Sequence, residues 1–275
     1  MARHGVELKS PAQLVKMRRA GLVVASVLAA VTAEVSPGVS TGELDDFAHE
    51  RILAAGATPS FLGYHGFPRV LCTSVNSEVV HGIPRPDKVL REGDVISIDC
   101  GAIVDGWHGD SAVTVPVGPV SDEAVELLRV CEESMWAVFA RACLGDRMRD
   151  LGGIVEDVVA PTGFAIVDHY GGHGIGSAMH QEPHVLNHSH GPKGPRLVEG
   201  MALAIEPMIT AGSPETRELA DGWTVVTVDG SWAAHFEHTF TMTAAGPWVL
   251  TAADGGAAKL AEYGVQVAAL DEVES

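Results

Sequence analysis

The sequence predicts an α+β fold made of two similar halves. Helices with recognisable capping residues alternate with short apolar strands, and the turn Asp105-Gly106 predicts an antiparallel hairpin. A weak internal repeat supports the two halves: V-I-S-I-D at 95–99 resembles A-L-A-I-E at 202–206, and each segment ends in a carboxylate. No linker or low-complexity segment divides the chain, so we expect one domain.

Length and composition set the limits of this domain. With 275 residues, of which 46% are hydrophobic, the chain can bury a full core, which excludes a disordered protein. We expect the domain to cover residues 1–275, with halves at about 1–120 and 121–252. The polar, acidic segment 253–275 is expected to form a C-terminal appendage at the surface.

The charge and the cysteine content limit the partners and the compartment that the chain can have. The chain has 36 acidic and 18 basic residues, a net charge of −18, which argues against a specific nucleic acid partner or an anionic membrane. The four cysteines, Cys72, Cys100, Cys131 and Cys143, contain no C-x-x-C pair. Reduced thiols in the cytoplasm are the better interpretation of this pattern.

The first helix is expected at 11–34. Two arginines precede the apolar run 20–33, and this arrangement is also typical of a signal peptide. A core helix is favoured because Ser10 can act as N-cap, Pro11 suits the first helical position, and 14 apolar residues are too few to span a bilayer.

Capping boxes, turn dipeptides and hydrophobic periodicity predict the remaining elements. Helices are expected from Ser40 to Gly56, from Ser121 to about Ala142, and from about Asp146 to Val159 with Met148, Leu151, Val155 and Val158 on one face. Residues 60–90 are expected to be loop with short strands. Further strands are expected at 95–99, 112–117, 163–167, 201–206, 224–228 and 231–243.

The predicted hairpin places two carboxylates side by side. A two-residue loop at Asp105-Gly106 pairs Asp99 with Ala112, so Asp99 and Asp110 are diagonal neighbours on one face. Two carboxylates on one face of apolar strands repel each other unless a cation lies between them. The alternative, a solvated acidic face, would suit the hairpin better if its strands were polar.

Histidines concentrate in segments rich in glycine and proline. His173 lies in Gly171-Gly172-His173-Gly174, and His81 and His180 lie in similar surroundings that we interpret as loops. A dense group formed by His184, His188 and His190 suggests a second zinc site. An irregular loop is the interpretation that we favour for this group, because Gly-Pro pairs follow it.

The chain resembles type I methionine aminopeptidases, which have the pita-bread fold. This fold has two pseudo-symmetric halves with a central curved antiparallel sheet covered by helices. The resemblance covers residues 8–252 and rests on motifs in family order. These are Tyr64-His65-Gly66-Phe67-Pro68, Cys72-Thr73-Ser74-Val75-Asn76, His81-Gly82-Ile83-Pro84, Ile98-Asp99-Cys100-Gly101, Gly109-Asp110, Gly172-His173-Gly174-Ile175-Gly176, Glu206-Pro207-Met208 and Phe236-Glu237-His238-Thr239.

The resemblance implies a dinuclear metallopeptidase. Its metal ligands would be Asp99, Asp110, His173, Glu206 and Glu237. Four carboxylates and one imidazole suit two divalent ions such as Co, Mn, Fe or Zn, whose identity the ligand types do not decide. The reaction implied is hydrolytic removal of the initiator methionine from peptides and nascent proteins.

The resemblance also implies roles for the residues around the metals. Glu206 would carry protons, while His81 and His180 would contact the scissile amide and stabilise the tetrahedral intermediate. A narrow methionine pocket would prefer substrates with a small second residue. The residues implied for this pocket are Phe61, Tyr64, Phe67, Cys72, Met179 and Trp223.

Two alternatives differ from this interpretation. An Xaa-Pro peptidase or prolidase shares the fold and the ligand types, and a non-catalytic pita-bread binding protein would lack ligands. The family implies a monomer. The basic residues Lys9, Lys16, Arg18 and Arg19 suggest a transient contact with the ribosome, although a solvated helix face is the simpler interpretation.

Overall fold

The computed structural model describes residues 5–268. The helices in this part of the chain are α1 (Pro11–Glu34), α2 (Thr41–Ala54), α3 (Asp122–Arg141), α4 (Met148–Val159) and α5 (Ala257–Glu262). The first four begin within two residues of their predicted starts. Side-chain oxygens of Ser10, Ser40 and Ser121 accept hydrogen bonds from the first turns of α1, α2 and α3, as their sequences predict.

Short strands supply most of the remaining regular structure. They are β1 (Thr58–Pro59), β2 (Leu71–Val75), β3 (Glu78–Val80), β4 (Val95–Val104), β5 (Trp107–Pro116), β6 (Ala165–Ile166), β7 (Gly171–Gly174), β8 (Gln181–Leu186), β9 (Ala202–Ile205), β10 (Met208–Thr210), β11 (Thr216–Glu218), β12 (Val225–Thr227), β13 (Ala233–His235), β14 (Glu237–Thr243) and β15 (Gly246–Val249).

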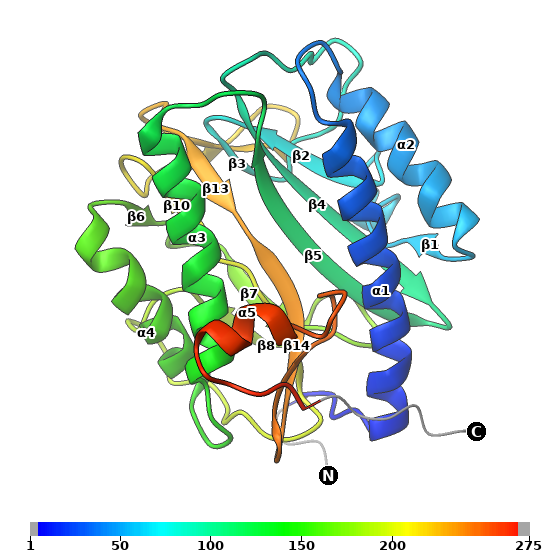
Figure 1. Ribbon diagram of the computed structural model, residues 1–275, viewed down its shortest axis with the longest axis vertical. Coiled ribbons are helices and arrows are strands. Elements are labelled where there is room, and N and C mark those ends of the chain that lie inside the picture. Colours follow the sequence, from blue (N-terminus) through cyan, green and yellow to red (C-terminus); the bar gives the residue numbers. More distant parts are fainter. Residues whose placement is uncertain (1–4, 269–275) are drawn as a thin grey trace.

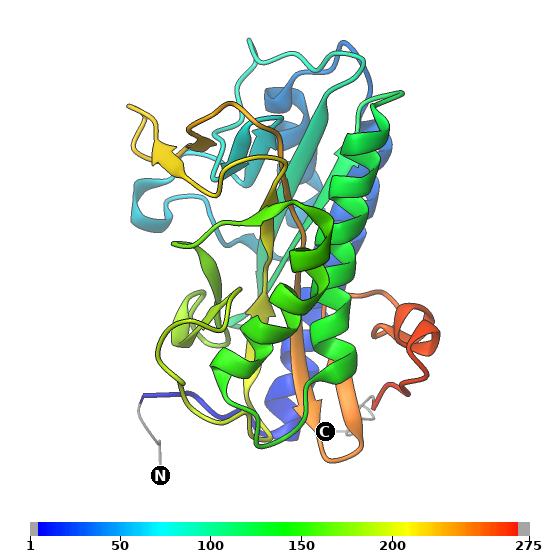
Figure 2. The same ribbon diagram turned by 90° about the vertical axis from the view of Figure 1, so that its left-hand side faces the viewer.

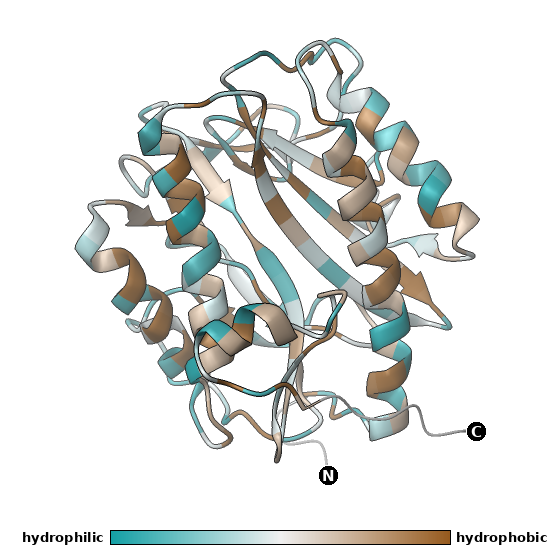
Figure 3. Ribbon diagram, in the orientation of Figure 1, coloured by the Kyte–Doolittle hydropathy of each residue, from teal (hydrophilic) through white to brown (hydrophobic). Residues whose placement is uncertain are grey.

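A curled antiparallel sheet forms the centre of the molecule. Its strand order is β1-β4-β5-β14-β9-β7-β8, with β2 beside β4 and β15 beside β14. Helices α1 and α3 lie across one face of this sheet (Figure 1), and a side view shows loops and the smaller sheets on the other face (Figure 2). Hydrophobic positions line α1 and the strands between the helices (Figure 3). The predicted α+β class is therefore confirmed.

The predicted hairpin register is confirmed residue by residue. Asp105 and Gly106 have φ angles of 50° and 79°, the left-handed pair that a tight hairpin turn requires. Val104 pairs with Trp107 and Asp99 pairs with Ala112. The turn thus determines which side chains share a face of the sheet.

The two predicted halves meet along the strand pair β5 and β14. Glu237 pairs with Ala112, so β5 of the first predicted half and β14 of the second are direct neighbours in the sheet. The prediction of one continuous strand over 231–243 is wrong. It divides into β13 and β14 at Phe236, because β13 pairs with β10 while β14 pairs with β5, β9 and β15.

The glycine-rich segment around His173 is a strand, which corrects its interpretation as a loop. Glycine is needed in β7 because the backbones are very close: a Cβ on Gly172 would lie 2.1 Å from the Ala204 carbonyl oxygen, and one on Gly174 would lie 2.3 Å from that of Glu182. The low strand propensity of glycine hides this strand from sequence analysis.

The apolar run 20–33 lies inside the core helix α1, as predicted. Met17, Ala20, Val24 and Val31 are fully buried. The backbone of β5 passes closely enough that a Cβ on Gly109 would lie 2.7 Å from the Gly21 nitrogen. None of the helices between residues 5 and 268 has the length and hydropathy needed to cross a bilayer.

The basic residues near the N-terminus do not form one solvated face. Lys9 is buried and its ammonium lies 3.5 Å from Glu7, while Arg18 donates hydrogen bonds to the carbonyl oxygens of Leu250 and Ala253. Only Lys16 and Arg19 of the four residues are exposed.

The segment after residue 252 is anchored to the rest of the domain. Leu260 on α5 is fully buried in the core cluster that contains Trp136 and Val249. Residues 269–275 of the predicted appendage lie outside the described residues.

Helix α4 packs tightly on the segment that follows β8. Its buried residues are Met148, Leu151, Val155 and Val159, the last in place of the predicted Val158. A Cβ on Gly152 would lie 2.4 Å from the His188 carbonyl oxygen, whereas one on Gly153 meets nothing nearer than 3.6 Å.

We therefore expect Gly152→Ala to lower the free energy of unfolding by about 1–3 kcal/mol through overpacking. The neighbouring Gly153→Ala should be neutral or stabilising by up to about 1 kcal/mol, since alanine favours the helix. Denaturant unfolding of both variants measures this difference. Equal effects of the two substitutions would contradict the close packing.

Candidate functional site

Five strands of the central sheet position the acidic cluster. Asp99 lies on β4, Asp110 on β5, His173 on β7 and Glu237 at the start of β14, while Glu206 directly follows β9. Glu237 pairs with Ala112, which lies two residues after Asp110 on β5. His173 pairs with Ala204, which lies two residues before Glu206. Residues far apart in sequence therefore meet on one face of the sheet.

The side chains of this cluster are close enough to share a cation. Asp110, His173 and Glu237 each offer a ligand atom, and these atoms lie within 4.8 Å of one another. The His173 Nε2 atom lies 3.5 Å from Glu206 Oε1 and 3.8 Å from Asp110 Oδ2.

Several oxygens of the cluster are buried without a hydrogen-bonding partner among residues 5–268. These are Oδ1 of Asp99, Oδ1 of Asp110 and Oε1 of Glu237. A buried carboxylate oxygen without a donor costs free energy, so three of them in one place indicate a missing positive ligand. The hard oxygen donors and the single imidazole fit divalent cations.

The pKa values of the cluster indicate that ionising its carboxyl groups without a bound cation is unfavourable. Burial raises the pKa of Asp99 to about 7 and raises the pKa values of Asp110, Glu206 and Glu237 well above their ordinary range. Repulsion between neighbours adds to the burial effect: Glu237 raises the pKa of Asp110, and Asp110 raises that of Glu206.

His173 is held ready to act as a ligand. Its Nδ1 atom lies 3.0 Å from the carbonyl oxygen of Gly174 and must donate a hydrogen to it. The lone pair of Nε2 is then directed at the carboxylates. Burial lowers the pKa of His173 to about 3, which keeps the imidazole neutral.

His235 is a member of this site that sequence analysis missed. It is 2% exposed, its Nε2 atom lies 3.8 Å from Glu206 Oε2, and that nitrogen has no hydrogen-bonding partner in the described part of the chain. Burial lowers its pKa to about 3. Its position two residues before Glu237 in the internal repeat, matching His108 before Asp110, was the available signal.

His81 and His180 line the same cavity as His173 and Glu206, which has a volume of about 490 Å³. His180 Nδ1 lies 2.8 Å from the Tyr64 hydroxyl, and its ring centroid lies 4.3 Å from that of His173. His81 has a φ of 58°, a strained conformation for a non-glycine residue. Burial lowers the pKa of His81 to about 4 and also lowers that of His180.

The six residues implied for a methionine pocket lie together. Phe61, Phe67, Cys72 and Met179 form one buried cluster, and Tyr64 and Trp223 pack against it. The Phe67 and Trp223 rings meet edge to face with centroids 5.1 Å apart. Cys72 also pairs with Asp99 across β2 and β4, so this apolar cluster adjoins the acidic one.

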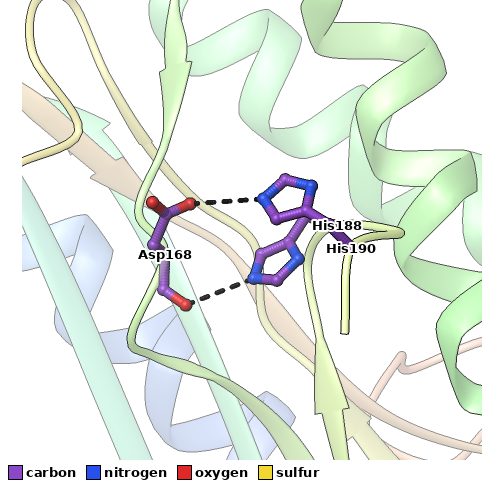
Figure 4. Close-up of side chains that lie close together, drawn as sticks. All are labelled: Asp168, His188 and His190. Atoms are coloured by element: carbon purple, nitrogen blue, oxygen red, sulfur yellow. Dashed lines mark hydrogen bonds and ion pairs between the residues drawn. The ribbon is translucent and has the colours of Figure 1, made fainter. Parts of the chain in front are cut away.

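The group of three histidines after residue 183 separates into two places. His184 lies opposite His173 on β8 and lines the cavity. His188 and His190 lie beside Asp168 instead (Figure 4).

Comparison with known proteins identifies the family. Residues 15–244 match the model of metallopeptidase family M24. The chain is 47% identical to methionine aminopeptidase 1 of Mycobacterium tuberculosis over 90% of this chain and 96% of that protein. It is 38% identical to the crystal structure of a methionine aminopeptidase from Thermotoga maritima, with a TM-score of 0.88 over 90% of this chain and 99% of that chain.

The chain therefore belongs to metallopeptidase family M24 and has its pita-bread fold. Within that family, its relatives at 40–47% identity are methionine aminopeptidases. An Xaa-Pro dipeptidase from Bacillus anthracis is similar in fold, with a TM-score of 0.72 over 89% of this chain and 61% of that chain, but only 21% identical. The prolidase alternative is thus not favoured, and the chain is a metal-dependent hydrolase.

The raised pKa values predict an unusual pH dependence for the metal-free protein. Above about pH 7.5 the histidines with lowered pKa values are largely neutral in both the folded and the unfolded state, and unfolded carboxyl groups are fully ionised. The folded carboxyl groups still hold protons, so the folded state binds more protons and its stability must fall as pH rises.

We expect the free energy of unfolding of chelator-treated protein to decrease by about 1 kcal/mol or more between about pH 7.5 and 8.5. Metal-loaded protein should show no such decrease, because bound cations keep the carboxylates ionised in the folded state. Denaturant unfolding at several pH values measures both. A metal-free stability that rises over this interval would contradict the buried acidic cluster.

Proposed function

We propose that the chain removes the N-terminal methionine from peptides and nascent proteins, and that Asp99, Asp110, His173, Glu206 and Glu237 hold two divalent cations for this reaction. The observation that carries the proposal is the position of an acidic cluster with unsatisfied buried oxygens directly beside a buried aromatic and thioether cluster. Four ionised carboxylates balance the charge of two divalent ions. When bound, such ions would acidify a water molecule and polarise the scissile carbonyl.

Glu206 is proposed to carry the proton from the attacking water to the leaving amine. Its side chain lines the same cavity as His81 and His180, so its carboxylate would face a substrate amide bound there. Its position is supported by Asn187, whose side-chain amide donates to the Glu206 carbonyl oxygen at 2.9 Å.

His81 and His180 are proposed to donate hydrogen bonds to the substrate amide. Burial keeps both imidazoles neutral at pH 7. If the Tyr64 hydroxyl donates to His180 Nδ1, the Nε2 atom of His180 carries the hydrogen and can donate to a carbonyl oxygen in the cavity. Tyr64 would then act as a positioning residue.

The apolar cluster is proposed to accept the methionine side chain. Aromatic edges of Phe61 and Phe67 favour a thioether. Met179 and Cys72 complete an apolar wall that excludes water. The cavity beside it would admit a small second residue, and the free α-amine would lie at the acidic cluster.

We also propose that the enzyme works in the cytoplasm as a monomer, where nascent chains are its substrates. The cations are drawn from Co, Mn, Fe and Zn. Any transient contact with the ribosome would involve Lys16 and Arg19, which are exposed on α1.

The proposal predicts the products of a simple peptide assay. Metal-stripped enzyme should not cleave Met-Ala-Ser, Gly-Pro or Ala-Pro, and added Mn²⁺ or Co²⁺ should restore release of methionine from the first peptide alone. Glu206→Gln should lower kcat by about 10²–10⁴-fold. The matched control is Glu218→Gln, which changes an exposed carboxylate on β11 and should leave the rate within twofold.

Cleavage of the proline peptides would move the assignment to a prolidase. No turnover with any metal would indicate that the site binds without catalysing.

A further inference from the structure

A second group of possible metal ligands lies outside the catalytic cluster. Asp168 follows β6, and His188 and His190 follow β8, so two connecting segments meet beside α4 (Figure 4). One ligand atom from each of these three residues lies within 4.8 Å of the others. None of the three belongs to the five ligands proposed above.

The contacts within this group direct a lone pair of His190 at a carboxylate oxygen of Asp168. The His190 Nε2 atom lies 3.9 Å from Asp168 Oδ1, and its Nδ1 atom lies 3.2 Å from Oε1 of Glu156 on α4. In a neutral His190 whose Nδ1–H donates to Glu156, the Nε2 lone pair faces a carboxylate oxygen. A carboxylate that holds the outer nitrogen of a histidine is the usual support of a metal-ligating imidazole.

His188 is the buried member of this group. It is only 7% exposed, and its Nδ1 atom has no hydrogen-bonding partner among the described residues. Its Nε2 atom has one partner, the Asp168 carbonyl oxygen at 3.3 Å. The ring stacks on that of His190 with centroids 3.9 Å apart. Figure 4 shows that Nε2 is the His188 nitrogen on the side of Asp168. A cation held here would therefore bind Nε2 in place of its hydrogen bond to the Asp168 carbonyl oxygen.

We propose that His188, His190 and Asp168 bind a divalent cation of the zinc class, with Glu156 orienting His190. Two imidazoles and one carboxylate are borderline ligands, which zinc accepts in tetrahedral sites with water as a fourth ligand. Bond lengths of about 2.0–2.1 Å place the ligands of such a site roughly 3.3–3.5 Å apart. Closing from 4.8 Å requires small rotations of His190 and Asp168, whose side chains are 71% and 52% exposed.

Such an ion would bind to two segments next to the catalytic cavity. Asp168 directly precedes His169, which lines the cavity. His188 directly follows Asn187, which donates to the Glu206 carbonyl oxygen. The bound cation would therefore join two segments that support the cavity, without touching the substrate.

Zinc content tests the proposal. Full-length protein would be treated with chelator, dialysed against micromolar Zn²⁺ and analysed for zinc per chain. Wild type should hold one zinc more than His190→Gln or Asp168→Asn, whatever number the catalytic site takes. His49→Gln is the matched control, since His49 lies on α2, across the molecule from α4 in Figure 1, and should keep the wild-type content.

Hydrogen exchange gives a second measurement, which does not depend on the number of zinc ions per chain. Zinc should slow exchange of the amides at 168–170 and 187–190 in wild type and in His49→Gln, but not in Asp168→Asn. Equal zinc content in all four proteins, or protection that persists in Asp168→Asn, would overturn the proposal. The outcome does not depend on whether methionine is released.

Discussion

The burial of four carboxylates on one face of an antiparallel sheet is the constraint on which the structure depends. Strands β4, β5, β9 and β14 each deliver one acidic side chain to the same place, at or just beyond a paired position. Without compensating charge this arrangement opposes folding, because desolvation and mutual repulsion both favour the protonated forms. Divalent cations bound at this cluster would offset the repulsion and would join the four strands that carry the carboxylates.

The surrounding elements keep this cluster rigid and closed. Glycines in β7 let the backbone approach β9 and β8 closely enough to bring His173 to the carboxylates. The Gly174 carbonyl oxygen fixes the tautomer of that histidine. The apolar cluster around Phe67 and Met179 adjoins the acidic cluster through Cys72, which pairs with Asp99. Under the proposed function, one sheet would therefore support both methionine recognition and catalysis.

Local signals explain what could be predicted from the sequence. Helix starts follow from serine caps, and the turn at Asp105 determines the pairing of Asp99 with Ala112. Strand β7 was missed because its glycines serve close packing rather than local strand preference. The spacing of His235 before Glu237 in the internal repeat was a signal that sequence analysis did not use. The meeting of Asp168 with His188 depends on a contact between distant segments, which residue spacing does not reveal.

The sign of the change in unfolding free energy that one substitution causes tests the central claim most directly. Without a cation, the Asp110 carboxyl group must take up a proton in order to be buried, and Asp110→Asn removes this cost, so we expect it to raise the free energy of unfolding of the metal-free protein at pH 7 and above. In the metal-loaded protein the same substitution should lower that free energy, because a ligand is lost. Denaturant unfolding with chelator and with excess Mn²⁺ measures both values. An effect of the same sign in the two states would contradict a carboxylate cluster held together by cations.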